Sequence, residues 1–357
     1  MGYRVKSPGR SGRSAPELTV LHALPRGLLG KSARALHEVL PGPTLIHLPG
    51  RRSPPLFVSV LLHGNEDVGW RAVQRLLGEC GGRALPRALS LFVGNVAAAR
   101  EGQRRLPGQP DYNRVWPGGG ATGCAEERVM QAVVDEMARL GVFASVDVHN
   151  NTGTNPHYAC VNRLDARFLS LAVLFSRTVV YFLRPTGVQS MAFAGLCPAV
   201  TLECGKVGEQ AGVDHAARFL SACLHLSDLP ARPPAAHDIE LFHTVAVLRL
   251  AHGSGASRPN RPCDGGWIRF VPDFDRLNFQ ELPAGTLLAH ADATGEAPLQ
   301  VWGEGGEDLT GRFLQQNGRD IRLRRPVMPA MLTLDQTVMQ QDCVGYFMER
   351  LRGPLRR

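Results

Sequence analysis

The sequence predicts an α/β fold: a largely parallel, mixed β-sheet with helices on both faces, followed by a C-terminal β-rich domain. Before residue 230, apolar runs typical of buried strands alternate with amphipathic helical patterns, and such alternation produces helix-covered parallel sheets. After residue 230, short runs follow one another between turns rich in glycine and proline, as antiparallel strands do. The boundary is marked by Pro230, Pro233 and Pro234, because neither a helix nor a central strand continues easily through them.

The elements of the first part follow from hydrophobic periodicity. Strands are expected at 56–62, 143–148 and 198–202, where short apolar runs occur. Residues 70–80 and 126–140 carry apolar side chains at spacings of three and four, which predicts amphipathic helices.

In the second part, several runs alternate apolar and polar residues, which is typical of half-buried antiparallel strands. These runs lie at 241–250, 267–271, 286–290, 299–302 and 320–323. We therefore divide the chain into a basic N-terminal segment at 1–50, an α/β domain at 51–230 and a β-rich barrel or sandwich at 235–357.

Most of the net charge of +8 is concentrated near the start of the sequence. Residues 1–35 contain seven basic side chains against Glu17, which leaves a surplus of six positive charges. Charge collected in one segment argues against a basic face on the folded body, and so against nucleic acid as a partner. No run of 18 apolar residues predicts a membrane helix, and the first 15 residues show no signal-peptide pattern. We therefore expect a cytoplasmic protein that binds neither nucleic acid nor membrane.

Three predicted strands end in residue types that can bind or use a metal ion. The first strand leads into His63-Gly64-Asn65-Glu66, the second into His149 and the third into Glu203. The carboxyl ends of neighbouring parallel strands form the crevice in which ligands bind. His63 and Glu66, three positions apart around a glycine, can converge on one ion with His149 as the third ligand. This donor set suits catalytic zinc, which leaves a fourth position for water.

Four motifs resemble those of the zinc carboxypeptidase superfamily, specifically its succinylglutamate desuccinylase and aspartoacylase branch. In the family's order, they are His63-Gly64-Asn65-Glu66 followed by Gly69, Asp111-Tyr112-Asn113-Arg114, Asp147-Val148-His149-Asn150-Asn151-Thr152, and Glu203-Cys204-Gly205. The resemblance covers about residues 55–230, while the C-terminal part is similar in placement and size only. It implies a zinc carboxypeptidase-like fold, with 51–230 as the zinc hydrolase domain.

The resemblance also implies one zinc ion per chain, bound by His63, Glu66 and His149. It assigns Glu203 as the general base, which takes a proton from the zinc-activated water and later returns it to the leaving nitrogen.

Two further roles concern the substrate. Asn113 and Arg114 resemble the pair that binds a substrate carboxylate, and Asp111 is expected to hold Arg114 in place. The family also has an upstream arginine that polarises the scissile carbonyl and stabilises the oxyanion. Arg104 and Arg105 are both available for this role; we take Arg105 as the candidate and keep Arg104 as the alternative.

The sequence thus predicts a zinc-dependent amidohydrolase that deacylates an N-acylated amino acid or a similar small amide carrying a carboxylate. The alternative enzyme is a zinc carboxypeptidase acting on short peptides. It is less favoured because His-Gly-Asn-Glu is closer to the deacylase branch and a C-terminal domain can roof the cleft. A non-catalytic zinc-binding or ligand-binding protein is the alternative of another class. The expected partner is a small molecule, and the sequence leaves the acyl group and any homo-oligomer open.

Overall fold

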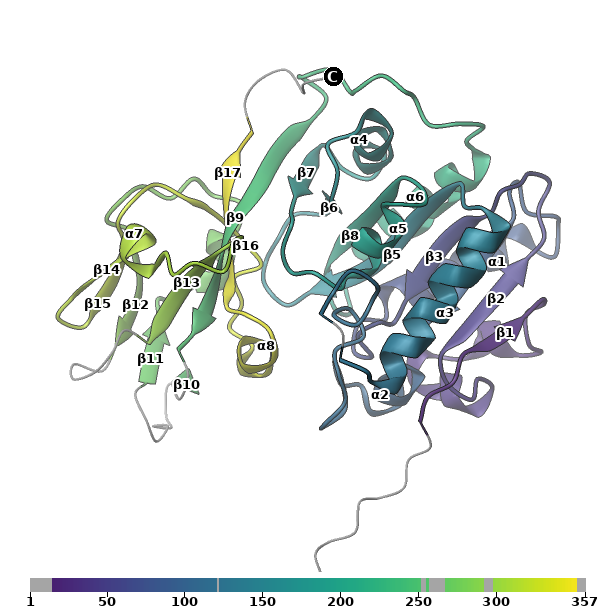
Figure 1. Ribbon diagram of the computed structural model, residues 1–357, viewed down its shortest axis with the longest axis horizontal. Helices are drawn as coiled ribbons and strands as arrows, with labels where there is room; N and C mark the ends of the chain where they lie inside the picture. The colour runs from purple at the N-terminus through teal and green to yellow at the C-terminus, as the bar shows by residue number, and fades with distance from the viewer. Residues whose placement is uncertain (1–14, 121, 252–254, 257–266, 292–297, 352–357) are drawn as a thin grey trace, which may run out of the picture.

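The structure is a computed structural model that describes residues 15–120, 122–251, 255–256, 267–291 and 298–351. Figure 1 shows a mixed α/β part beside a β-rich part, with the long strand β9 running between them. The first 14 residues, which carry four of the seven N-terminal basic side chains, lie outside the described residues. Within the ranges given above, none of the helices combines the length and the apolar character that a bilayer span requires.

A twelve-stranded mixed sheet runs through both parts in the order β1-β2-β4-β3-β5-β8-β6-β7-β9-β17-β16, and β13 also pairs with β9. Its strands are β1 (Thr19–Leu21), β2 (Thr44–Leu48), β3 (Leu56–Val60), β4 (Leu89–Val93), β5 (Ala144–Asn151), β6 (Tyr158–Val161), β7 (Thr178–Tyr181), β8 (Ala199–Lys206), β9 (Glu240–Leu250), β13 (Leu299–Gly303), β16 (Met328–Ala330) and β17 (Gly345–Arg350). Between β1 and β9, six of the eight neighbouring pairs are parallel. The predicted largely parallel, mixed sheet is confirmed.

The predicted strands β3, β5 and β8 lie next to one another, in parallel, at the centre of this sheet. Every residue of β3 and β5 is buried, as expected for strands covered on both faces. The register pairs Ser59 with Asp147 and His149 with Glu203. Because side chains alternate along a strand, all four of these point to the same face of the sheet. Ser59 donates a hydrogen bond of 2.6 Å to Asp147 on that face.

Helices cover both faces of the sheet, as the sequence predicts. On one face, the Phe193 ring of α5 stacks on Phe57 at 4.3 Å between centroids. On the other, α1 lies so close that a Cβ at Gly69 would be 2.8 Å from Val60 and 3.0 Å from Val148. The helices are η1 (Leu28–Gly30), η2 (Ala33–Glu38), α1 (Val68–Cys80), α2 (Val96–Glu101), α3 (Ala125–Leu140), α4 (Ala166–Val173), α5 (Gln189–Phe193), α6 (Gln210–His225), η3 (Phe274–Leu277), α7 (Thr310–Phe313) and α8 (Gln336–Gln341).

The N-terminal segment contributes to the fold as well as to the charge. Strands β1 and β2 extend the large sheet beyond β4. Leu28 and Leu36 of the two short helices are fully buried, and Trp70 donates a hydrogen bond of 2.8 Å to the Lys31 carbonyl. Residues 1–50 are therefore more than a basic tail, since their described portion packs onto the α/β part.

The β-rich part is confirmed, and its five predicted strands lie within one residue of the observed ends. A second sheet has the order β10-β11-β12-β15-β14. Its strands are β10 (Gly255–Ala256), β11 (Trp267–Phe270), β12 (Leu287–Ala291), β14 (Leu314–Asn317) and β15 (Asp320–Leu323). One apolar core contains Leu248 and Phe347 from the large sheet with Leu288 and Leu323 from the small one, so the two sheets pack as a sandwich. The large sheet itself is continuous across the predicted boundary, because β9 pairs in parallel with β7.

Candidate metal centre and active site

His63 and Glu66 come from the turn between β3 and α1. Leu61 has a left-handed backbone conformation, with φ of 56°, so the chain changes direction immediately after the strand. The Glu66 N–H then donates a hydrogen bond of 3.1 Å to the His63 carbonyl. Gly64 leaves no room for a side chain, since a Cβ there would lie 2.2 Å from the backbone nitrogen of Ala99. This close approach explains why glycine separates the two polar residues.

A buried His-Glu-His group lies where these strands end. His63, Glu66 and His149 each offer a ligand atom within 4.8 Å of the others. The Nδ1 atoms of His63 and His149 each lie 2.8 Å from a different carboxylate oxygen of Glu66. Two imidazoles and a carboxylate that converge in this way form a group that can bind a metal ion.

Each imidazole is also held by a carboxylate on its far side. His63 Nε2 lies 3.0 Å from Asp111 Oδ1, and His149 Nε2 lies 2.7 Å from Asp147 Oδ2. Metal-binding histidines are typically oriented by such partners, which leave the other ring nitrogen facing the ion. Although burial lowers the pKa of His149, Asp147 and Glu66 outweigh that effect and raise the pKa well above its usual value. The two carboxylates therefore favour a positive charge on or next to the His149 ring.

Glu203 faces His149 from the neighbouring strand. The two residues are register partners in β8 and β5. The Glu203 side chain is buried, and its Oε2 atom has no hydrogen-bond partner among the described residues. Burial raises the pKa of Glu203 to about 8, because a low-dielectric environment disfavours the charged form. A carboxyl group with a free oxygen and a pKa near neutrality is suited to accept and return a proton.

The set of His63, Glu66 and His149 is called the metal group below. Of the two candidate arginines, Arg104 reaches this group and Arg105 does not. The Arg104 guanidinium lies 3.5 Å from Glu66 Oε1 and lines the pocket. Arg105 instead donates a hydrogen bond of 3.0 Å to the carbonyl of Gln109, and it is not among the residues that line the pocket. The geometry therefore favours the alternative that the sequence analysis ranked second.

The Asp111 side chain, which was expected to hold Arg114 in place, pairs with other groups. Asp111 pairs with Arg104 at 3.1 Å and with His63 at 3.0 Å. It also accepts a hydrogen bond of 2.8 Å from the Asn113 N–H. The Asp111 side chain therefore orients the imidazole and Arg104, while its backbone carbonyl accepts a hydrogen bond of 2.9 Å from the Arg114 N–H.

Asn113 and Arg114 both line the pocket. Asn113 Oδ1 accepts a hydrogen bond of 3.0 Å from the Gln189 N–H, and its Nδ2 lies 3.3 Å from His149 Nε2. The Nη1 of Arg114 donates to the Asn113 carbonyl at 2.8 Å. Its Nη2 donates to both carboxylate oxygens of Asp342, at 2.8 and 2.9 Å. Arg114 thus has a carboxylate partner from its own chain.

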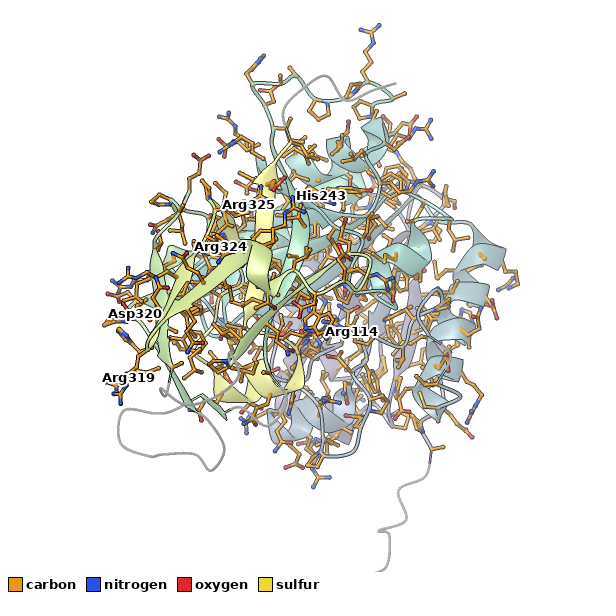
Figure 2. All side chains as sticks on the ribbon, turned by 60° about the vertical axis from the view of Figure 1, so that its left-hand side comes forward. Arg114, His243, Arg319, Asp320, Arg324 and Arg325 are labelled. Atoms are coloured by element: carbon orange, nitrogen blue, oxygen red, sulfur yellow. The ribbon has the colours of Figure 1, made fainter. Side chains whose placement is uncertain are left out.

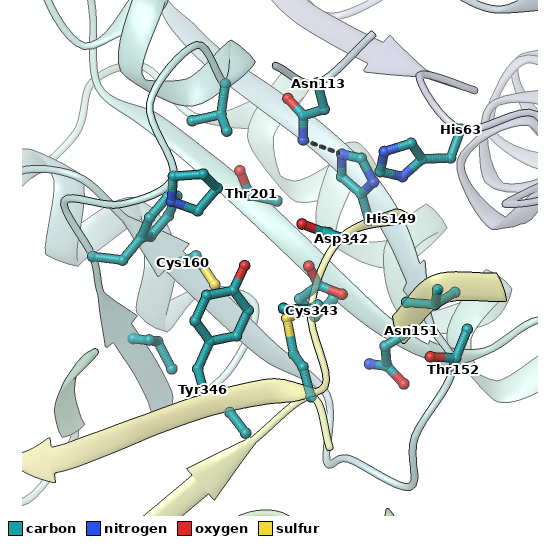
Figure 3. Close-up of a pocket in the computed structure, with 18 of the residues that line it drawn as sticks. His63, Asn113, His149, Asn151, Thr152, Cys160, Thr201, Asp342, Cys343 and Tyr346 are labelled. Atoms are coloured by element: carbon teal, nitrogen blue, oxygen red, sulfur yellow. Dashed lines mark hydrogen bonds between the residues drawn. The ribbon is translucent and has the colours of Figure 1, made fainter. Parts of the chain in front are cut away.

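Asp342 is the site residue that sequence reasoning missed. It follows α8 in the β-rich part and also pairs with Arg104 at 3.0 Å. Figure 3 shows Asp342, from the loop before β17, and Tyr346, from β17, in the pocket with Asn113. Figure 2, which brings the β-rich part forward, shows Arg114 near the middle of the view and Asp320 at the outer edge of the β-rich part. No local pattern marks Asp342, since its partner Arg114 is 228 positions away.

The pocket encloses about 980 Å³, including its open mouth, and both parts of the molecule line it. The metal group and Glu203 form its polar end. Much of the remaining wall is apolar or aromatic and comprises Tyr158, Cys160, Val180, Phe182, Val188, Ala330, Met331 and Val338. The Tyr158 hydroxyl is buried without a hydrogen-bond partner among the described residues.

Residues 53–229 match the family model described as the succinylglutamate desuccinylase/aspartoacylase catalytic domain. This part of the chain belongs to that family. The resemblance stated from the four motifs is thereby confirmed, and the family is one of hydrolytic deacylases. The comparison with curated proteins gave no match.

Solved structures extend the likeness over both parts of the molecule. The succinylglutamate desuccinylase from Chromobacterium violaceum has a TM-score of 0.55 at 18% identity, over 85% of this chain and 87% of that one. The product-bound ectoine utilization protein EutE from Ruegeria pomeroyi has a TM-score of 0.55 at 16% identity, over 85% and 88%. The succinylglutamate desuccinylase/aspartoacylase from Rhodobacter sphaeroides has a TM-score of 0.53 at 15% identity, over 85% and 88%. These structures share the fold of this protein.

Proposed function

We propose that the protein is a zinc-dependent amidohydrolase that removes the acyl group from a small N-acyl compound. The observation that carries the proposal is the buried group of His63, Glu66 and His149, with Glu203 beside it on the adjacent strand. The family assignment of residues 53–229 supports the same class of reaction. A cytoplasmic location and the absence of nucleic-acid and membrane partners stay predictions.

The residues of the group fit one zinc ion. Neutral imidazoles and a carboxylate are its usual ligands, and Asp111 and Asp147 already orient the two rings. When bound, zinc supplies Lewis acidity to a carbonyl and lowers the pKa of water towards roughly 7.

The protein's own side chains supply the proton transfers and the oxyanion contact. We assign the unpartnered Oε2 of Glu203 as the acceptor of the proton from the attacking water, and the same carboxyl group then donates it to the leaving nitrogen. Arg104 donates hydrogen bonds to the carbonyl oxygen as negative charge develops there. Asn113 and Arg114, on the pocket wall, bind the part of the substrate that does not react.

The shape of the pocket favours a deacylase over a carboxypeptidase. Met331, Asp342 and Tyr346 from the β-rich part line the same pocket as the metal group. This second part therefore limits the space available to a long peptide, and a small acylated compound fits better.

A hydrolysis screen of the zinc-loaded protein tests the reaction. N-acetyl, N-succinyl and N-formyl amino acids are compared with short peptides, and release of the free amine is measured. We expect at least one acyl amino acid to be hydrolysed faster than any peptide. Cleavage of peptides alone, at their C-terminal bond, would transfer the assignment to a carboxypeptidase. No hydrolysis of the peptides, of the acyl amino acids or of their carboxamides would reject the proposed function.

Metal analysis and one variant test the site. The purified protein should hold about one zinc ion per chain, and His149→Ala should lose it because only two ligands remain. Glu203→Gln keeps the shape of the side chain but cannot shuttle protons, so it should retain zinc and lose turnover by on the order of a hundredfold or more. Equal zinc content in His149→Ala, or full turnover in zinc-loaded Glu203→Gln, would refute the corresponding role.

A further inference from the structure

Asp342 neutralises the arginines that face the substrate. Its carboxylate lies 2.8 Å from Arg114 and 3.0 Å from Arg104, and Arg104 also pairs with Asp111 at 3.1 Å. Arg104 also lies 3.5 Å from Glu66, so the two guanidinium groups face three carboxylates. Although burial raises the pKa of Asp342, Arg114 and Arg104 outweigh that effect and lower it below the usual value. The Asp342 side chain is therefore an anion, and it is always present because it belongs to the same chain.

A carboxylate on the substrate would have to compete with this internal anion. If Asp342 stays in place, the new carboxylate adds a second negative charge at Arg114, where the charge of Asp111 already acts. If Asp342 is displaced, a buried and paired carboxylate loses both of its cations, which is unfavourable. A neutral group meets neither penalty.

The rest of the pocket wall offers such a neutral group an apolar surface. Val180, Phe182, Met331 and Val338 line the pocket together with the buried ring of Tyr158. Among the described lining residues, the remaining arginine is Arg184, which is exposed. It donates a hydrogen bond of 3.1 Å to the Glu304 carbonyl, and solvent screens its charge at the surface.

We propose that Asp342 is a specificity-determining residue, which makes the pocket select substrates whose bound group is uncharged and apolar and disfavour those that place a carboxylate at Arg114. This inference rests on the proposed function and deepens it by naming the substrate class. It departs from the carboxylate-bearing substrate that the family resemblance implies. The specificity arises from an unfavourable interaction with the wrong substrate as well as a favourable one with the right substrate.

The test compares N-acetyl-L-leucine with its carboxamide, N-acetyl-L-leucinamide, which differ only in the carboxylate. We measure kcat/KM for deacetylation of both by zinc-loaded wild type and by Asp342→Asn, which keeps the size of the side chain and removes its charge. Wild type should prefer the amide by about tenfold or more, and Asp342→Asn should shift the acid-to-amide ratio about tenfold towards the acid. Glu281→Gln is the matched control, because it removes one exposed negative charge from the same part of the molecule and should leave the ratio unchanged.

The outcomes separate this inference from the proposed function. An unmoved ratio in an active Asp342→Asn variant overturns the inference alone, and so does a selective loss of acid hydrolysis, which would make Asp342 a positioning residue for Arg114. If Asp342→Asn does not fold, the preference of wild type between the acid and the amide decides. Faster hydrolysis of the acid would contradict a pocket that disfavours carboxylates. Absence of hydrolysis of every acyl compound rejects the proposed function, and the inference with it.

Discussion

At the scale of single residues, two adjacent arginines, Arg104 and Arg105, differ in whether they reach the pocket. Arg104 and Arg105 are equally basic, and the spacing of the motifs does not distinguish them. Only the path of the backbone distinguishes them. The Arg104 carbonyl accepts a hydrogen bond of 3.1 Å from the Gly64 N–H, which brings Arg104 next to the turn that carries His63 and Glu66. Adjacent side chains leave an irregular chain in different directions, so Arg105 is directed to Gln109 instead.

Substitutions of these two arginines should therefore have different effects on turnover. Arg104→Gln should lower kcat by on the order of a hundredfold or more, because it removes the donor proposed for the developing oxyanion. Arg105→Gln should keep kcat within about threefold of wild type, since its side chain serves only the loop at Gln109. Both variants are assayed as zinc-loaded protein with the best substrate from the hydrolysis screen. A large loss in Arg105→Gln with a small one in Arg104→Gln would restore the assignment first made from the sequence.

The site residues that could be predicted are those that follow strands directly. His63, Glu66, His149 and Glu203 follow or end apolar runs, and parallel strands bring such ends together whatever the loops do. Asp342 could not be predicted in this way. Its position depends on the packing of the β-rich part against the pocket, and no pattern near residue 342 records that packing.

At the scale of elements, the five-residue helix α5 organises one wall of the pocket. Its Gln189 N–H donates to Asn113, and the Gln189 side chain donates to Ser145 of β5 at 2.6 Å. At its other end, the Phe193 ring stacks on Phe57. The sequence does not predict this helix, because five residues are too few to show a helical period. Tertiary packing rather than local propensity therefore stabilises it.

Removal of its anchoring ring should loosen the helix. Phe193→Ala should lower the free energy of unfolding by about 3–5 kcal/mol, since it leaves a cavity against the sheet. Leu196→Ala is the matched control, because Leu196 follows the same helix and is 40% exposed; its effect should stay within about 0.5 kcal/mol. Urea denaturation of both zinc-loaded variants gives the comparison, and KM should also rise in Phe193→Ala as Asn113 loses its support. Equal stability of the two variants would show that α5 is not held by this contact.

At the scale of the whole molecule, sequence patterns located the two parts but not their connection. The prolines near residue 230 lie between α6 and β9, and the change to short alternating strands identifies the β-rich part. The parallel pairing of β7 with β9 makes one sheet of both parts, and it joins segments about 60 residues apart in the chain. Such non-local pairing leaves no signal in a single local pattern, so the predicted boundary did not show that the sheet crosses it.

The two parts also meet closely at Gly153, in the loop after β5. A Cβ at Gly153 would lie 2.0 Å from the backbone oxygen of Leu332. Asn278 fixes that backbone on both sides, accepting from the Leu332 N–H at 2.8 Å and donating to its carbonyl at 3.0 Å. The loop is held again where Thr152 donates to the Thr333 hydroxyl at 2.8 Å. The end of β5, which carries His149, and the segment next to Met331 are therefore closely packed against each other.

Gly153→Ala should consequently push the β-rich part away from the pocket. Overpacking of this kind costs about 1–3 kcal/mol of stability, and the displacement of the Met331 segment and of Asp342 should raise KM by roughly tenfold while the zinc content stays at that of wild type. Gly195→Ala provides the control, because no atom lies within 4 Å of a Cβ at that position. Thermal unfolding, zinc analysis and KM are measured on both variants. If Gly153→Ala behaves like Gly195→Ala, the two parts can shift against each other freely, and the β-rich part does not determine the shape of the pocket.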